Sequence, residues 1–227
     1  MDIRRFVPLL LAAIMPALLA GCGAGPSAQP VQTQAPAAAQ PPAVAATGTA
    51  VTGRYTVVAA RSSASYHARE KFVSRQLPSD AVGTTAVISG DLLFGEKGLG
   101  ASTVSVDLRT LKSDEGRRDN FIQGRTLQTS QYPMAVFSVT GSSPAPLLFA
   151  EGQPMPFQIT GTLKVHGVEK PLTWDATGTR QGSAINVKAT TAFKLSDFQI
   201  QAPDIGGMLK VEDGMKLSID LTLQPAG

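Results

Sequence analysis

Residues 215–223, MKLSIDLTL, alternate strictly between apolar and polar side chains. Successive side chains of a β-strand point to opposite faces of the sheet, so this alternation predicts a strand with one buried and one solvated face. The same period returns, less strictly, at residues 185–193 and 102–108. Half-buried strands of this kind are typical of antiparallel sheets, and the chain after residue 53 is therefore expected to be all-β.

The segment around His166 predicts a β-hairpin together with its register. One face of its first strand carries Phe157, Ile159, Gly161, Leu163 and Val165. His166 and Gly167 form a two-residue turn, in which glycine readily adopts the positive φ that such turns need. Trp174 then lies opposite Ile159, and Ala176 lies opposite Phe157, so the apolar sets of the two strands share one face.

The number of strands limits the architecture. About eight or nine strands, separated by turn residues, can be placed after residue 53. The sequence shows neither strand–helix alternation nor an internal repeat, which leaves a β-sandwich or an up-and-down barrel. About 170 residues is generous for a sandwich whose strands are this short. An eight-stranded barrel, in contrast, can hold one small ligand inside.

Residues 117–133, RRDNFIQGRTLQTSQYP, break the strand pattern. We predict one short helix here, capped by Ser113 and Asp114 and laid against one mouth of the barrel. Its apolar stripe is expected to face the interior and consists of Phe121, Ile122 and Leu127.

The first 21 residues have the layout of an export signal. Arg4 and Arg5 precede an apolar run at residues 6–19 that is too short for a permanent membrane span. The sequence LAGC, which ends at Cys22, resembles the lipobox of bacterial lipoproteins, in which cleavage precedes a cysteine that carries lipid such as palmitate. We therefore expect an exported protein whose Cys22 anchors it to a cell-envelope membrane.

Residues 22–53 are expected to form a linker between the lipidated cysteine and the folded domain. After Cys22 this segment has no charged and no aromatic residue and consists mostly of Ala, Pro, Gln, Gly and Thr. Such a composition cannot bury enough apolar surface to fold. The predicted organisation is thus a signal peptide at 1–21, a disordered linker at 22–53 and a β-barrel domain at 54–227.

The bulk composition excludes several classes of function. The formal net charge is only +3, which does not indicate nucleic acid as a partner. Cys22 is the only cysteine, and the two histidines, His67 and His166, are far apart in sequence, so neither an internal disulfide nor a metal site is expected. The chain carries no nucleotide-binding loop or nucleophile motif, and we predict no catalytic residue, no cofactor and no enzymatic activity. The oligomeric state is left open, with a homodimer among the states allowed.

Two blocks of sequence carry a family resemblance: RRDNFIQGRTLQTSQYPMAVF at 117–137 and ITGTLKVHGVEKPLTW at 159–174. With the neighbouring strands, they make residues 54–223 resemble the YceI-like family of bacterial exported proteins. The resemblance implies a lipocalin-like antiparallel barrel that binds a polyisoprenoid, such as a long-chain quinone or a prenyl pyrophosphate, without catalysis. Many members carry a histidine two places after the Arg-Asp pair. Phe121 stands at that place here, so a headgroup role for this histidine is absent.

The candidate binding residues follow from the inner faces of the strands and from the helix. The ligand-binding candidates, each with plain core packing as its alternative, are Tyr66, Phe94, Phe121, Phe137, Phe157, Leu163, Trp174 and Phe193. The headgroup candidates are Glu70, Arg118 and Asp119. The alternative for Glu70 is a strand end that already reaches solvent, and for Arg118 and Asp119 it is pairing with neighbours that fixes the helix.

The predicted function is binding of an elongated apolar lipid, a polyisoprenoid or isoprenoid quinone, for storage or transport. The competing function is a structural or interaction module of the cell envelope, with a packed barrel and no ligand.

Overall fold

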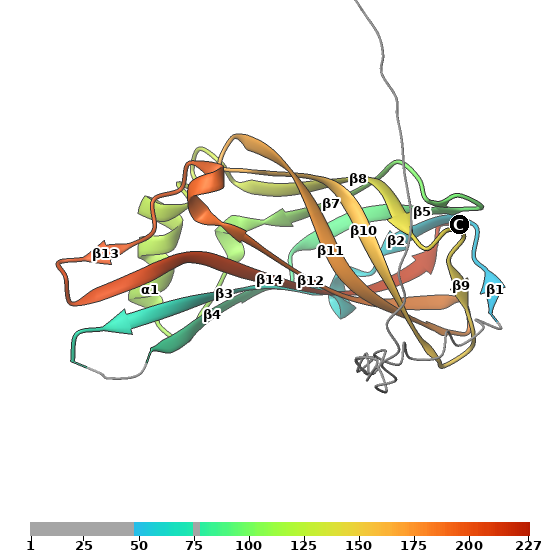
Figure 1. Ribbon diagram of the computed structural model, residues 1–227, viewed down its shortest axis with the longest axis horizontal. Coiled ribbons are helices and arrows are strands. Elements are labelled where there is room, and N and C mark those ends of the chain that lie inside the picture. Colours follow the sequence, from blue (N-terminus) through green and yellow to red (C-terminus); the bar gives the residue numbers. More distant parts are fainter. Residues whose placement is uncertain (1–47, 75–77) are drawn as a thin grey trace, which may run out of the picture. The chain divides into compact units, whose positions relative to one another are not determined.

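Eight strands pair edge to edge in a closed ring in the computed structural model, which describes residues 48–74 and 78–227 (Figure 1). Around the ring these strands are β2 (Gly53–Val57), β5 (Ile88–Gly95), β7 (Ser102–Asp107), β8 (Met134–Ser143), β10 (Pro154–Val165), β11 (Val168–Gln181), β12 (Ala184–Lys194) and β14 (Leu209–Pro225). The ring closes because β14 pairs with β12 on one side and with β2 on the other. The pairings are antiparallel, which confirms the predicted eight-stranded barrel and excludes the sandwich.

The remaining strands extend the two ends of the ring. They are β1 (Thr49–Ala50), β3 (Ser63–Phe72), β4 (Ser79–Thr85), β6 (Gly98–Leu99), β9 (Leu148–Phe149) and β13 (Asp204–Ile205). Strand β14 is long enough to pair with β3 over residues 209–220 as well as with β2 over residues 223–225. Figure 1 shows the β3–β4 hairpin, β13 and α1 (Gly116–Phe121) at one end of the barrel, and β1, β9 and the C-terminus at the other. We call these the helix end and the β1 end.

Short helical segments interrupt the strands within the described residues. Besides α1 they are the 3-10 helices η1 (Ala59–Arg61), η2 (Leu108–Thr110) and η4 (Leu195–Phe198) and the π-helix η3 (Ile122–Thr126). The one short α-helix was predicted, but its capping residue was not. Glu115 caps α1, and its carboxylate accepts a hydrogen bond from the Arg117 N–H at 3.1 Å. Ser113 and Asp114 do not cap the helix: the Ser113 hydroxyl donates to the Asp119 carboxylate, and the Asp114 carboxylate accepts from the Arg118 guanidinium.

The hairpin between β10 and β11 has the predicted register. Ile159 pairs with Trp174, and Phe157 pairs with Ala176. The turn residues His166 and Gly167 both have positive φ, at 51° and 77°, as two-residue hairpin turns require. The predicted inner face of β10 is buried along its whole length.

Burial along β14 divides the barrel interior into two parts. Leu221 and Leu223 are buried, whereas Met215, Leu217 and Ile219 on the same face are only partly buried. The alternation itself is unbroken. Toward the helix end, however, this face borders open space, while toward the β1 end it packs against other side chains.

Four aromatic side chains fill the β1 end. Tyr55 and Phe94 have ring centroids 5.2 Å apart, Phe94 and Phe149 are 6.1 Å apart, and Phe149 and Phe157 are 6.3 Å apart, all edge to face. This is the favoured geometry of aromatic pairs, and Phe149 is 1% exposed. We call these four residues the aromatic plug, because they close the barrel interior at this end.

The folded part begins before residue 54. Strand β1 pairs with β9, and Val51 is buried in the core, so residues 48–53 pack on the barrel rather than belonging to the linker. The reason is that small residues can pair through backbone groups without a periodic pattern of side chains. The predicted signal peptide, Cys22 and the rest of the linker lie outside the described residues. The described helices are all too short or too polar to cross a membrane.

Candidate functional site

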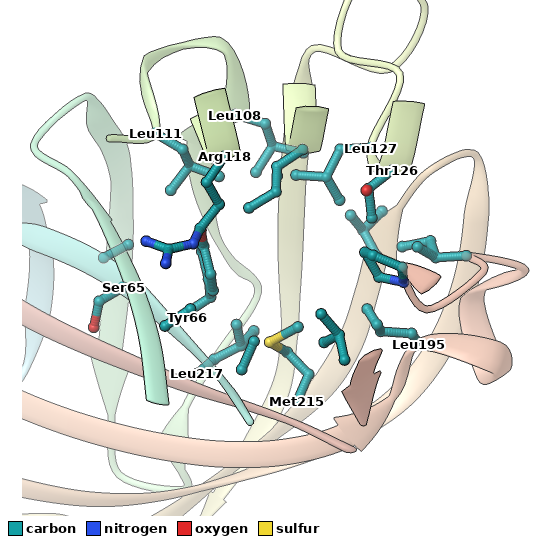
Figure 2. Close-up of a pocket in the computed structure, with 18 of the residues that line it drawn as sticks. Ser65, Tyr66, Leu108, Leu111, Arg118, Thr126, Leu127, Leu195, Met215 and Leu217 are labelled. Carbon is teal, nitrogen blue, oxygen red and sulfur yellow. The ribbon is translucent and has the colours of Figure 1, made fainter. Parts of the chain in front are cut away.

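The barrel interior at the helix end contains a cavity of about 890 Å³. This volume is near the upper end of the range typical of small-molecule sites. Figure 2 shows Leu108 and Leu111 on one wall, Met215 and Leu217 on the opposite wall and Leu195 at the side. The cavity is thus a space walled mainly by aliphatic and aromatic side chains, as an apolar ligand requires.

The segment α1–η3 forms one wall of this cavity. Phe121, Ile122 and Leu127 all line it, as predicted for the apolar stripe of the helix. The Gln123 side-chain amide donates to the Leu111 carbonyl at 2.9 Å, which ties η3 to the chain leaving η2. The Arg125 guanidinium lies 5.7 Å from the centre of the Phe121 ring, a cation–π contact.

An ion-pair cluster lies where α1 meets β3. Arg118 donates to both carboxylate oxygens of Glu70, from Nε at 3.2 Å and from Nη2 at 3.4 Å. Its Nη1 contacts the Ser113 hydroxyl at 3.3 Å and also bonds to Asp114. The Glu70 side chain is only 4% exposed, so the alternative of a strand end in solvent is wrong. The buried carboxylate on this inner face has the partner that burial demands.

Asp119 lies behind this cluster and does not line the cavity. Its carboxylate accepts from the Ser113 backbone N–H at 2.8 Å and from the Ser113 hydroxyl at 2.7 Å. These bonds fix the turn that leads into α1. The headgroup assignment of Asp119 is therefore not supported by its position, and its contacts match the structural alternative.

The cluster sets the electrostatics of the cavity. Burial raises the pKa of Tyr66 from 10.0 to about 12; Arg118 opposes this rise, and Asp119, Glu70 and Asp114 add to it. Partial burial disfavours the charged form of Arg118, but the bonds and charges of Asp114 and Glu70 outweigh this and raise its pKa further. Tyr66 is therefore a neutral phenol and Arg118 a cation at neutral pH. Figure 2 shows both side chains in the same part of the cavity.

The structure brings most of the predicted ligand-binding residues together. Those that line the cavity are Tyr66, Phe121, Phe137, Leu163, Trp174 and Phe193. Phe94 and Phe157 do not line it, because both belong to the aromatic plug at the β1 end. Strand alternation identified their inward direction correctly but carries no information about depth along the barrel. For Phe94 and Phe157, core packing is thus the correct description.

Several lining residues were not predicted as site residues. The aliphatic ones include Leu108, Leu111, Leu195, Met215 and Leu217. The alternation at residues 215–223 already placed Met215 and Leu217 on an inner face, so this signal was present. No alternation pointed to Leu111 or Leu195, since Leu111 follows η2 directly and Leu195 is the first residue of η4.

Two polar atoms of the cavity wall lack a hydrogen-bond partner within the part of the chain that the structure describes. They are the indole Nε1 of Trp174 and the hydroxyl oxygen of Thr126. Trp174 is 3% exposed. Buried polar groups are almost always satisfied, so these two atoms stand out among the polar groups of the cavity wall. The described residues contain no group of three or more His, Cys, Asp or Glu that could hold a metal ion.

Comparison with known families decides the classification of this barrel. The model of the YceI-like domain matches residues 55–223, almost the whole barrel. The chain belongs to the YceI-like domain family. The segments that carry the resemblance in the sequence, α1 with η3 and the β10–β11 hairpin, also contribute residues to the cavity wall.

Among curated YceI-like relatives, a UPF0312 protein of Pseudomonas putida (strain GB-1) is 32% identical over 130 residues, which cover 53% of this chain and 64% of the relative. Protein YceI of Escherichia coli O157:H7 is 31% identical over 133 residues, which cover 55% of this chain and 65% of the relative. This chain therefore spans less than two thirds of the length of these relatives.

Solved structures share the YceI-like fold at low sequence identity. A polyisoprenoid binding domain from Saccharophagus degradans, implicated in plant cell wall breakdown, has a TM-score of 0.62 at 17% identity, covering 76% of this chain and 98% of that domain. Burkholderia cenocepacia BcnA has a TM-score of 0.57 at 18% identity, covering 73% of this chain and 98% of BcnA. At these identities the likeness establishes the fold alone.

Proposed function

We propose that this YceI-like protein binds an elongated apolar lipid, a polyisoprenoid or an isoprenoid quinone, in the cavity at the helix end, and stores or transports it. The observation that carries the proposal is the apolar cavity of about 890 Å³. At roughly 30 Å³ per water-sized group, this volume holds on the order of 30 non-hydrogen atoms. The solved domain described as polyisoprenoid binding has the same fold, which supports the choice of lipid class.

The driving force is the removal of an apolar chain from water. Burial contributes about 25 cal/mol per Å² of apolar surface, or about 0.8 kcal/mol per methylene group. The ring strands that carry part of the cavity wall are hydrogen-bonded on both sides, which fixes their positions before the ligand enters. Catalysis is not part of the proposal, since Glu70, the buried carboxylate at the cavity, is engaged by Arg118.

Mass spectrometry of the gently extracted protein tests the proposal. We expect an isoprenoid lipid to co-purify in a stoichiometric amount. A barrel that never retains lipid, and that does not take up added isoprenoid alcohol or quinone, would favour the structural envelope module instead.

A matched pair of variants shows whether the lipid occupies this cavity. Ala68 lies on the inner face of β3 and lines the cavity, so Ala68→Phe should reduce bound lipid severalfold. Ala192 is exposed on β12, so Ala192→Phe should bind like the wild type. Equal lipid content in the two variants, both folded, would place the ligand elsewhere.

The membrane anchor is a separate part of the proposal. It rests on the sequence LAGC ending at Cys22. We infer that lipid on Cys22 holds the protein at a cell-envelope membrane, with the barrel outside the cytoplasm. A barrel placed at a membrane surface has direct access to membrane lipids as ligands.

A further inference from the structure

The charged residues at the cavity are predominantly acidic. Four carboxylates line it, those of Glu70, Asp80, Asp114 and Glu115, against two guanidinium groups, those of Arg117 and Arg118. Asp119, directly behind the cluster, adds a further carboxylate whose bonds are to Ser113 rather than to a cation. An anionic ligand would therefore meet more negative than positive charge where the cavity reaches the protein surface.

Arg118, the cation that lines the cavity, is already engaged through all three guanidinium nitrogens. Its Nε and Nη2 bond to Glu70, and its Nη1 bonds to Ser113 and Asp114, which leaves one N–H of Nη2 unused. Glu70 is buried, so its carboxylate depends on this cation. A phosphate held by more than the one unused N–H would have to break these bonds and leave the buried carboxylate unpaired. The high pKa of Tyr66 is in keeping with this, since burial first and the surrounding carboxylates after it disfavour a negative charge on its oxygen.

Two neutral polar groups of the cavity wall, in contrast, have no partner among the described residues. The Trp174 indole N–H is a donor, and the Thr126 hydroxyl can donate or accept. Neighbouring atoms cover both polar atoms, so a ligand oxygen reaches them only after a side-chain movement. Both groups suit a carbonyl or hydroxyl oxygen, which needs one or two hydrogen bonds and no counter-charge.

We propose that the cavity selects a lipid whose polar part is an uncharged oxygen function, a carbonyl or a hydroxyl, and discriminates against a lipid that ends in a phosphate. The inference rests on the proposed lipid binding and narrows its ligand class. Of the two classes that the family resemblance implies, it favours the quinone-like ligand over the prenyl pyrophosphate for this chain. The specificity comes from Glu70 and Asp114, which neutralise Arg118.

The test compares two probes with the same tail, farnesol and farnesyl monophosphate, by titration calorimetry on the full chain freed of endogenous lipid. We expect farnesol to bind at least about tenfold more tightly than the phosphate. Equal affinities, or tighter binding of the phosphate, would overturn the inference while leaving lipid binding intact. Binding of neither probe would instead refute the proposed function, and the specificity with it.

Variants of the cluster sharpen the test. Asp114 is 83% exposed, so the Asp114→Asn protein should fold normally. The change removes one of the two carboxylates that neutralise Arg118. It should therefore raise the affinity for farnesyl monophosphate about tenfold and leave the affinity for farnesol unchanged. Glu70→Gln should act in the same direction if it folds. Glu212→Gln removes the same charge from an exposed ion pair with Lys71 outside the cavity lining and should change neither affinity. An Asp114→Asn protein that discriminates as strongly as the wild type would show that the cluster does not set the specificity.

Discussion

Replacing Arg118 with alanine should destabilise the folded protein far more than the loss of an exposed arginine. Removing one partner of a buried ion pair costs about 3–5 kcal/mol, because the remaining charge stays buried without compensation. Glu70 is 4% exposed, but Arg118 is 21% exposed, so solvent can reach part of the site and the lower figure of about 3 kcal/mol is appropriate. For a domain of this size, such a loss lowers the Tm by about 6–12 °C.

Urea unfolding followed by tryptophan fluorescence measures this loss. Trp174 is the only tryptophan of the chain and is buried, so its emission reports on the barrel itself. The protein must be free of lipid, because a ligand bound to the folded state would add its own stabilisation. Arg54→Ala serves as the matched control. Arg54 and Asp91 form an ion pair whose side chains are 53% and 33% exposed, and its loss should cost less than about 1 kcal/mol.

A double variant separates the charge effect from the loss of side-chain packing. Glu70→Gln combined with Arg118→Met removes both charges of the buried pair and should recover most of the stability that Arg118→Ala loses. The reasoning is refuted if Arg118→Ala costs no more than Arg54→Ala, or if the double variant is as unstable as the sum of its single changes. Retained lipid binding in the weakened Arg118→Ala protein would support the structural role of this arginine.

Other perturbations test the cavity walls, the plug and the anchor. In an alkaline absorbance titration, the wild type should show a tyrosine ionisation near pH 12 that Tyr66→Phe lacks. Because folding raises the pKa of Tyr66 from 10.0, the wild type should lose stability as the pH rises from 10 to 12, and the variant should lose less. Phe149→Ala should lower the free energy of unfolding by about 3–5 kcal/mol while lipid binding at the helix end persists, which binding titrations under native conditions would check. In Gly83→Ala the new Cβ would lie 2.2 Å from Cε1 of Tyr66, so the free energy of unfolding should fall by about 1–3 kcal/mol and lipid binding should weaken. Gly141→Ala is the control: its new Cβ has its nearest neighbour at 3.6 Å, so the loss of stability should be small. Cys22→Ser should abolish incorporation of labelled palmitate and move the protein from the membrane to the soluble fraction.

The sequence predicted the barrel well because side-chain alternation is a local property. The register of the β10–β11 hairpin followed from pairing Ile159 with Trp174, and the structure has that pair. At Thr222 the alternation of side chains predicts the wrong environment. Thr222 falls on the wet face by alternation, yet it is buried, because its hydroxyl donates to the Arg61 carbonyl at 3.1 Å across a distance of many residues in the chain. Contacts of this kind depend on the closed ring of strands and cannot be predicted from the alternation of apolar and polar residues.

The sequence predicted which residues of the candidate site point into the barrel, but not how far along the barrel they lie. Tyr66 and Phe94 both point inward, but one lines the cavity and the other belongs to the aromatic plug, because position along the barrel depends on how the strands are staggered. The partner of Glu70 was also hidden, since Arg118 is distant in sequence and approaches only after α1 folds against β3.

The aromatic plug packs the barrel interior at the β1 end, so the cavity does not run through the whole barrel. Under the proposed function, a lipid chain would enter and leave at the helix end, and the barrel would not pass it through the β1 end, which the plug packs. The partner that supplies the lipid and the partner that receives it would then use the same opening one after the other. The barrel would have to turn or move between them. A tail that entered first would then lie toward the aromatic plug, with the polar part of the lipid nearest the opening and the first part to meet the next carrier.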